Sequence, residues 1–216
     1  MEALVFAGGD PLDARWRAHL PRGAWVVAAD SGLEHVRALG LHADLVVGDF
    51  DSVTPATLAA AEADGTLVER HPADKDATDL ELALDEARAL DARRVLVVAS
   101  ASGRLDHLLG SLLLLGSKRY SGLELDAFVG DALVHVIRDE RTLAGTPGEL
   151  LTLLPVGGPA TGVETAGLEY PLARETLEPG TSRGVSNVFA AETATVSVEE
   201  GTLFAIRPGG ARERLC

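Results

Sequence analysis

Cysteine and basic residues are scarce in this chain of 216 residues, and each scarcity excludes a class of protein. The only cysteine is Cys216, so no disulfide can form within the chain, and we expect a cytoplasmic protein. The 33 acidic residues outnumber the 19 basic ones, giving a net charge of −14. This charge argues against nucleic acid or an anionic membrane surface as a partner. A small anionic ligand would need local cations or a metal ion.

Long apolar runs and the usual nucleotide-binding motifs are also absent. The first apolar run, Ala3 to Ala7, is too short for the core of a signal peptide, and no stretch reaches membrane-spanning length. Neither G-x-G-x-x-G nor G-x-x-x-x-G-K-[ST] occurs in the chain. Any phosphate-binding function must therefore use other residues.

Short apolar runs alternate with helical patterns over the first half of the chain. This alternation is typical of βαβ units and predicts an α/β domain with a Rossmann-like parallel sheet covered by helices. The predicted strands are 3–9, 25–30, 44–51, 66–72 and 94–100, and the helical patterns are 11–20, 31–40, 54–65 and 76–91.

From about Leu123 the pattern changes to short strand-like runs separated by Gly, Pro and Asp, which predicts a small all-β sandwich. We expect an α/β domain over residues 1–138 and a β-sandwich domain over 139–216, with 138–148 as the connection. The predicted strands here are 123–130, 132–140, 149–158, 193–201 and 202–210.

Aspartates follow four successive predicted strands. Ligands of an open parallel sheet bind outside the carboxyl ends of its strands, so we expect these acids along one edge. Asp is also a favoured helix N-cap, which explains any one of them by itself, but a turn does not need both Asp49 and Asp51. The acids are Asp30, Asp49, Asp51, Asp74, Asp76, Asp79 and Asp106.

Asp49 and Asp51 stand two apart at the end of an apolar run, so strand alternation predicts that they converge while Phe50 faces away. Like charges at that distance repel unless a cation joins them. Oxygen ligands favour Mg²⁺, which proteins usually hold together with substrate phosphates. Lys75 and Arg104 are the basic residues placed to neutralise those phosphates.

These residues resemble those of the thiamine pyrophosphokinase family, and the likeness runs nearly from end to end. It rests on the order and spacing of several short motifs more than on any single one. The motifs are "AADSG" at 28–32, "DLVVGDFDS" at 44–52, "DKDATDLELAL" at 74–84, "GRLDH" at 103–107, "GLEYPL" at 167–172 and "SRGVSN" at 182–187.

The resemblance implies an enzyme that transfers diphosphate from ATP to the hydroxyl of thiamine, working as a homodimer with thiamine bound between subunits. It implies catalytic roles for Asp49, Asp51, Lys75, Asp76, Asp79, Arg104 and Asp106, with Mg²⁺ held by Asp49, Asp51 and Asp79. By the same resemblance, ATP would contact Asp30, Ser31, Gly32, Thr78, Ser102 and Gly103, and thiamine would contact Tyr170, Ser186 and Asn187. The first motif departs from the family's common Asp-Gly-Gly, because Ser31 stands at its second position.

Three other functions use the same acids. A related diphosphokinase would act on a pterin alcohol, a Mg²⁺-dependent nucleotide hydrolase would use water, and a binding module would hold thiamine or a nucleotide without reaction. The "SRGVSN" segment at 182–187 favours thiamine over a pterin. The sequence does not choose between Asp76 and Asp106 as the carboxylate that orients the attacking hydroxyl.

Overall fold

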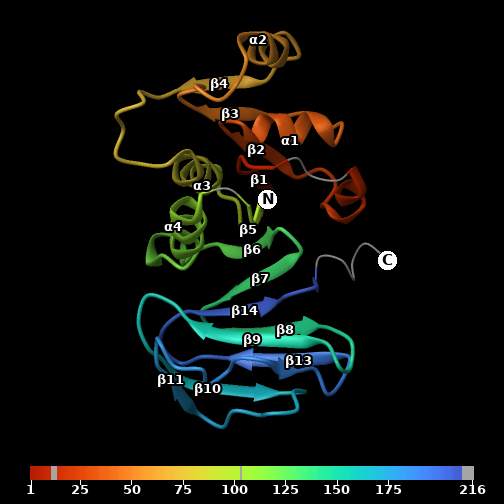
Figure 1. Ribbon diagram of the computed structural model, residues 1–216, viewed down its shortest axis with the longest axis vertical. Coiled ribbons are helices and arrows are strands. Elements are labelled where there is room, and N and C mark those ends of the chain that lie inside the picture. The colour runs from red at the N-terminus through yellow and green to blue at the C-terminus, as the bar shows by residue number, and fades with distance from the viewer. Residues whose placement is uncertain (11–13, 103, 211–216) are drawn as a thin grey trace. The chain divides into compact units, whose positions relative to one another are not determined.

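The computed structural model describes residues 1–10, 14–102 and 104–210, and its chain forms two compact units (Figure 1). Of the described residues, unit 1 comprises Met1–Ser111 and Gly122–Gly130, and unit 2 comprises Leu112–Ser121 and residues 131–210. The division of the chain into two domains at residue 138 stays a prediction.

Unit 1 is built on a parallel sheet with the strand order β6-β5-β1-β2-β3-β4. The parallel α/β pattern predicted for this part of the chain is therefore confirmed. The strands are β1 (Glu2–Phe6), β2 (Trp25–Ala29), β3 (Leu45–Gly48), β4 (Leu67–Arg70), β5 (Arg94–Ala99) and β6 (Glu124–Val129).

The helices begin where the sequence offers good N-caps. The side chains of Thr54 and Thr78 accept hydrogen bonds from backbone N–H groups three residues further on. The segment predicted as the first helix contains a 3₁₀-helix instead, η1 (Ala14–His19). The α-helices are α1 (Gly32–Ala38), α2 (Pro55–Ala63), α3 (Asp79–Ala89) and α4 (Leu105–Leu115), and a second 3₁₀-helix is η2 (Lys118–Tyr120).

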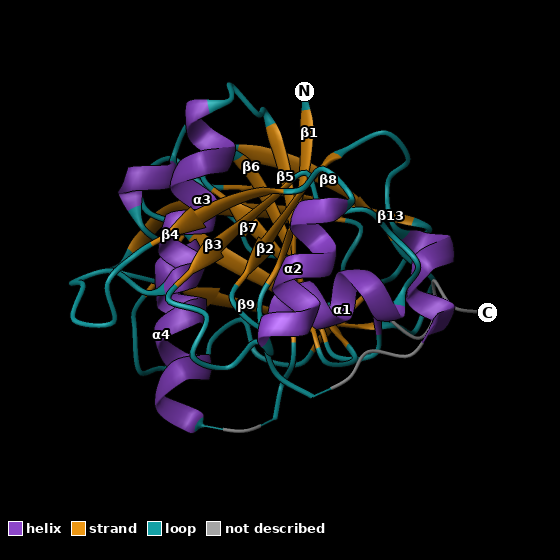
Figure 2. Ribbon diagram, turned by 90° about the horizontal axis from the view of Figure 1, so that it is seen from above, coloured by secondary structure: helices purple, strands orange, loops and turns teal. Residues whose placement is uncertain are grey.

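Both faces of the central strands are covered. Every residue of β3 and the last four residues of β1 and of β2 are buried, as expected for parallel strands between two helical layers. Helices α1 and α3 both pack on β1 and β2, and Figure 2 shows them on opposite sides of these strands. None of the helices in the described part of the chain has the length and apolar composition needed to cross a membrane.

Unit 2 contains two antiparallel sheets, with strand orders β12-β9-β14-β7 and β11-β10-β13-β8. Residues from both sheets, including Leu153, Val163 and Val196, share one buried apolar cluster. The strands are β7 (Ala132–Ile137), β8 (Glu140–Ala144), β9 (Leu150–Pro155), β10 (Ala160–Ala166), β11 (Glu175–Leu177), β12 (Asn187–Val188), β13 (Thr193–Ser197) and β14 (Leu203–Arg207).

The segment 138–148 is not a plain connection, because it contains strand β8. Leu143 is the one buried residue of this strand, and each of its five residues pairs with β13. A single apolar residue among charged and polar ones gives no periodic signal, so the sequence pattern did not predict this strand.

A buried ion pair lies in unit 2. Arg207 of β14 makes two hydrogen bonds to the carboxylate of Glu149, and both side chains are only 6% exposed. The guanidinium also lies 5.7 Å from the centroid of the Phe189 ring. Removing one charge of such a pair leaves the other charge buried without a partner. A substitution at either residue is therefore expected to destabilise the fold.

Glu149→Gln is therefore expected to lower the free energy of unfolding by about 3 kcal/mol, because Arg207 would face a neutral amide in a buried site. Urea unfolding measures the change. Glu62→Gln is the control, since Glu62 pairs with Arg70 at the surface, and its effect should be much smaller. Equal effects of the two substitutions would contradict the assignment of Glu149 and Arg207 as a buried, stabilising ion pair.

Candidate active site

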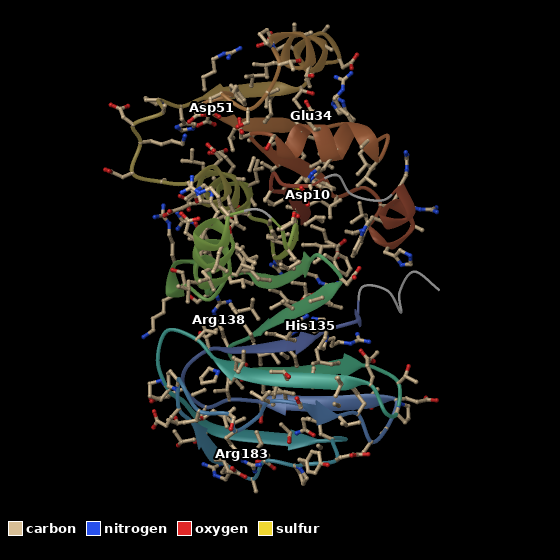
Figure 3. The ribbon with its side chains drawn as sticks, viewed as in Figure 1. Asp10, Glu34, Asp51, His135, Arg138 and Arg183 are labelled. Carbon is tan, nitrogen blue, oxygen red and sulfur yellow. The ribbon has the colours of Figure 1, made fainter. Side chains whose placement is uncertain are left out.

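Three carboxylates converge at the carboxyl ends of β2 and β3. Asp30 follows β2 directly and Asp49 follows β3, and these two strands are parallel neighbours. One carboxylate oxygen from each of Asp30, Asp49 and Asp51 lies within 4.8 Å of the other two (Figure 3, where Asp51 is labelled). The predicted gathering of acids at this edge is thus present for these three residues, which we call the acid cluster.

Asp30 is the most buried member of the acid cluster, at 9% exposure. Its backbone is left-handed, with φ of 45°, a conformation that Asp tolerates better than most residues. Its N–H donates to the Val47 carbonyl at 2.8 Å, and its own carbonyl accepts from the Leu33 N–H at 3.1 Å, so it links β3 to the start of α1. No hydrogen-bond partner among the described residues reaches Asp30 Oδ1.

Asp49 and Asp51 meet through a turn and not through strand alternation. Strand β3 ends at Gly48, and Phe50 has a left-handed φ of 61°. The Asp51 N–H donates to Asp49 Oδ1 at 3.2 Å, which brings the two side chains together. Phe50 is buried as expected, and the Arg70 guanidinium lies 5.3 Å from its ring centroid.

Gly48 makes the close approach of the acids possible. Its φ is +154°, and a Cβ built there would lie 3.2 Å from Asp30 Cα and Cβ and 3.3 Å from Asp79 Oδ1. A side chain at this position would press on Asp30 and Asp79 at once. The glycine of the "GDFDS" motif is therefore a steric requirement of the site.

Lys75 connects the acid cluster to α3. Its Nζ lies 3.2 Å from Asp49 Oδ2 and 3.1 Å from Asp79 Oδ1. Burial lowers the pKa of Lys75, but the hydrogen bonds and charges of Asp79 and Asp49 outweigh it, so the pKa is raised and the ammonium is kept. Asp79, predicted as a metal ligand, is not a member of the acid cluster. That role stays a prediction.

The three acids differ in how well their charges are compensated. Burial raises the pKa of Asp30, and the charges of Asp79, Asp49 and Asp51 add to this, while the Ser31 N–H opposes it. The pKa of Asp49 is lowered by the Asp51 N–H and by Lys75. Hard oxygen donors, one of them buried without a hydrogen bond, are the donor set that a divalent cation such as Mg²⁺ takes.

The residues predicted to contact ATP lie mostly at the starts of helices. Ser31 precedes α1, and Gly32 is its first residue, where a Cβ would lie 2.0 Å from the Phe6 carbonyl oxygen. Thr78 uses its hydroxyl to accept the Glu81 N–H at 3.2 Å as the N-cap of α3. Asp76 is exposed and precedes that cap, so it is not part of α3.

Arg104 and Asp106 pair with each other at the start of α4. The Arg104 Nη2–Asp106 Oδ2 distance is 2.6 Å, and the side chains are 70% and 63% exposed. The guanidinium lowers the pKa of Asp106 to about 2. Nearby, the hydroxyls of Ser100 and Ser102 are 2.6 Å apart. Gly103, also predicted to bind ATP, lies outside the described residues.

Unit 2 has a pocket of about 360 Å³, which contains all three residues predicted to contact thiamine. Within it, Arg183, which is labelled in Figure 3, is held by Glu175 through two hydrogen bonds of 2.7 and 2.8 Å. Tyr170 is 58% exposed, so its ring is available to a ligand. The residues around this unit 2 pocket are Tyr170, Leu172, Ser182, Arg183, Gly184, Val185, Ser186 and Asn187.

Comparison with known proteins assigns both parts of the chain. Residues 17–126 match the family model "Thiamin pyrophosphokinase, catalytic domain", and residues 134–203 match "Thiamin pyrophosphokinase, vitamin B1 binding domain". The chain belongs to the thiamine pyrophosphokinase family. The acid cluster lies within the first matched range and the unit 2 pocket within the second.

Individual members of the thiamine pyrophosphokinase family agree with this assignment. A thiamine pyrophosphokinase of Bacillus subtilis is 25% identical over 191 residues, covering 84% of this chain and 86% of the relative. Thiamine pyrophosphokinase 2 of Arabidopsis thaliana is 26% identical over 76% of this chain and 64% of its own length. The crystal structure of thiamin pyrophosphokinase from Geobacillus thermodenitrificans is 27% identical with a TM-score of 0.81, covering 96% of this chain and 97% of that one.

The structure of thiamine pyrophosphokinase from Bacillus subtilis shares the fold, with a TM-score of 0.84 at 22% identity over 96% of this chain and 98% of that one.

Two features of the site were not predicted from the sequence. One is that Asp30, predicted at this edge as an ATP contact, is the third converging carboxylate where Asp79 was expected, and the other is the pairing of Arg183 with Glu175. The position of Asp30 after a buried strand was the available signal for the first.

Asp30→Asn is expected to raise the free energy of unfolding at neutral pH. The pKa of Asp30 is raised, so its ionised form costs stability, and the cost appears as pH rises from 3.8 through the folded-state pKa. Asparagine removes the charge and tolerates the left-handed backbone. Urea unfolding between about pH 4 and pH 8 should show a gain that grows with pH.

Asp49→Asn is the matched control and should lower the free energy of unfolding, whereas Asp30→Asn raises it. The pKa of Asp49 is lowered by the Asp51 N–H and Lys75, so its ionised form contributes stability above pH 3.8, which the neutral amide loses. Stabilisation by both substitutions, or by neither, would contradict these electrostatic assignments.

Proposed function

We propose that this protein transfers diphosphate from ATP to the hydroxyl of thiamine, releasing thiamine diphosphate and AMP. The acid cluster is the observation that carries the proposal, because it provides the cation site that a triphosphate needs, within the range matched by the catalytic-domain model. Residues 1–138 would form a Rossmann-like domain that binds ATP, and residues 139–216 a β-sandwich that binds thiamine. The cytoplasmic location stays a prediction.

Asp30, Asp49 and Asp51 would hold Mg²⁺, and the orphaned Oδ1 of Asp30 supports its inclusion. When bound, the ion would neutralise phosphate oxygens and polarise the bond that breaks. Asp79 would join the ligands only if its ion pair with Lys75 opens. Lys75 could then turn from Asp49 and Asp79 to a phosphate oxygen, which offers it comparable charge.

Positioning of the reactants would come from residues at the helix starts. We propose that Ser31, Gly32, Thr78, Ser102 and Gly103 contact ATP and that Arg104 offsets charge on its phosphates. A carboxylate would orient the thiamine hydroxyl. Arg104 already bonds both carboxylate oxygens of Asp106, and this favours Asp76 for that role.

We further propose a homodimer with thiamine bound between subunits. Helix α4 supports it, because Leu105, Leu109 and Leu113 are 66%, 51% and 62% exposed. Their spacing of four residues places them along one side of the helix. Exposed apolar stripes of this kind mark interfaces more often than free surface.

The alternatives differ in the acceptor and not in the acids. A pterin alcohol, water, or no acceptor at all would use the same acid cluster. The match of residues 134–203 to a vitamin B1 binding domain favours thiamine over each of them. A non-catalytic module is also disfavoured, because binding alone does not need Lys75 and Arg104 in addition to the acids.

Incubation of the purified protein with ATP, Mg²⁺ and thiamine is expected to give AMP and thiamine diphosphate in equal amounts. Asp49→Asn and Asp51→Asn should each lower kcat at least about a hundredfold while the circular dichroism spectrum is kept. Chromatography of the nucleotides and of thiamine diphosphate measures both products. Parallel reactions with a pterin alcohol or without acceptor separate the alternatives, and AMP release without thiamine would reject the proposal.

Leu109→Asp is expected to weaken the dimer at least about tenfold, because a charge would replace an apolar contact at the proposed interface. Sedimentation equilibrium measures the dissociation constant. Leu67→Asp is the control, since Leu67 is 62% exposed but lies on β4. A monomeric wild-type protein, or equal weakening by both variants, would reject α4 as the interface.

A further inference from the structure

Both polar atoms of the Asn187 side chain bond the backbone of a single residue, Tyr170. Asn187 Oδ1 accepts the Tyr170 N–H at 3.1 Å, and Nδ2 donates to the Tyr170 carbonyl at 2.7 Å. Oδ1 also accepts the Val188 N–H at 2.9 Å. Three of the four hydrogen-bonding positions of the carboxamide are thus occupied by backbone groups. The side chain is 3% exposed, so little of it reaches the unit 2 pocket.

Tyr170 lies in a segment between two strands that is not itself part of a strand. Strand β10 ends at Ala166 and β11 begins at Glu175, and between them Glu169 N–H donates to the Val188 carbonyl at 2.9 Å. At Tyr170 the Asn187 carboxamide replaces a neighbouring peptide group, since it offers the same acceptor and donor. The backbone of Tyr170 is therefore fixed although the residue as a whole remains 58% exposed.

We propose that Asn187 is a positioning residue of the acceptor site, which acts through Tyr170 and does not bind the acceptor itself. The identity of the acceptor rests on the proposed function. An aromatic ring held in advance offers its face to a flat heterocycle without losing freedom when the ligand binds. Asn187 thus differs from Ser186, whose exposed side chain also lines the unit 2 pocket.

A double-mutant cycle tests this role. Asn187→Leu keeps the side-chain volume and adds no charge, and it should raise KM and Kd for thiamine about tenfold with KM for ATP unchanged within about twofold. Tyr170→Ala should also weaken thiamine binding. In the Tyr170→Ala background, Asn187→Leu should change Kd for thiamine by less than about twofold. Independent, additive effects would mean that Asn187 contacts the acceptor, and would overturn the proposal.

Thr152→Val is the matched control for general disturbance of the segment. The Thr152 hydroxyl accepts the Ser186 N–H at 3.0 Å, so this substitution also removes one side-chain hydrogen bond to the backbone around the pocket. It leaves the bonds between Asn187 and Tyr170 in place. Its effect on thiamine binding should therefore add to that of Tyr170→Ala. Loss of additivity here as well would show a loosened segment and overturn a specific role for Asn187.

A second measurement needs no variant and stands if Asn187→Leu fails to fold. Asn187 is the only Asn, and the chain has no Gln, so the ¹⁵N-labelled protein has a single side-chain carboxamide. One of its N–H protons should exchange with solvent at least about tenfold more slowly than in the urea-unfolded protein. Exchange of both protons at the unfolded rate would overturn the proposal. An inactive wild-type protein would contradict the proposed function instead, because this measurement uses no substrate.

Discussion

Repulsion between like charges is the constraint on which the site depends. Asp30, Asp49 and Asp51 bring their oxygens within 4.8 Å of one another, and Asp79 is close enough to raise the pKa of Asp30. Three free carboxylates in water would move apart, but here backbone hydrogen bonds hold them close together. The N–H of Asp30 is bound to β3, and the N–H of Asp51 is bound to Asp49. The stability of the parallel sheet thus offsets the repulsion of the site.

The strain of holding the carboxylates together lies in the local backbone. Asp30 and Phe50 both have left-handed φ angles, and Gly48 between them has a φ of +154°. Three special conformations within two adjacent loops is the pattern expected where side chains are forced together for function. The buried ring of Phe50 and the helix begun at Gly32 keep these loops in place.

The sequence predicted the elements whose signals are local. Continuous apolar runs predicted the strands from β1 to β5, and acids after those runs predicted the edge at which the site lies. It did not predict β8, whose single buried residue is Leu143, or the turn at Phe50 that joins Asp49 to Asp51. It did not predict the hydrogen bonds between the Asn187 carboxamide and the backbone of Tyr170, and the thiamine contact of Asn187 stays a prediction. The pairing of β8 and the bonds of Asn187 depend on partners far along the chain, which no local pattern records. The turn at Phe50 is local, but it needs a left-handed backbone at a residue type that does not favour it.

Lys75 gives the acids a counter-ion of their own. Its ammonium lies against both Asp49 and Asp79, with the side chain 13% exposed. A sodium or potassium ion would bring these carboxylates no more charge than the ammonium already supplies, and would leave Lys75 without a partner. A divalent ion bound to a polyphosphate would bring twice that charge. Its phosphate oxygens would also give the Lys75 ammonium a new anionic partner. If the site takes a divalent ion, as proposed, the tethered ammonium would disfavour monovalent ions there.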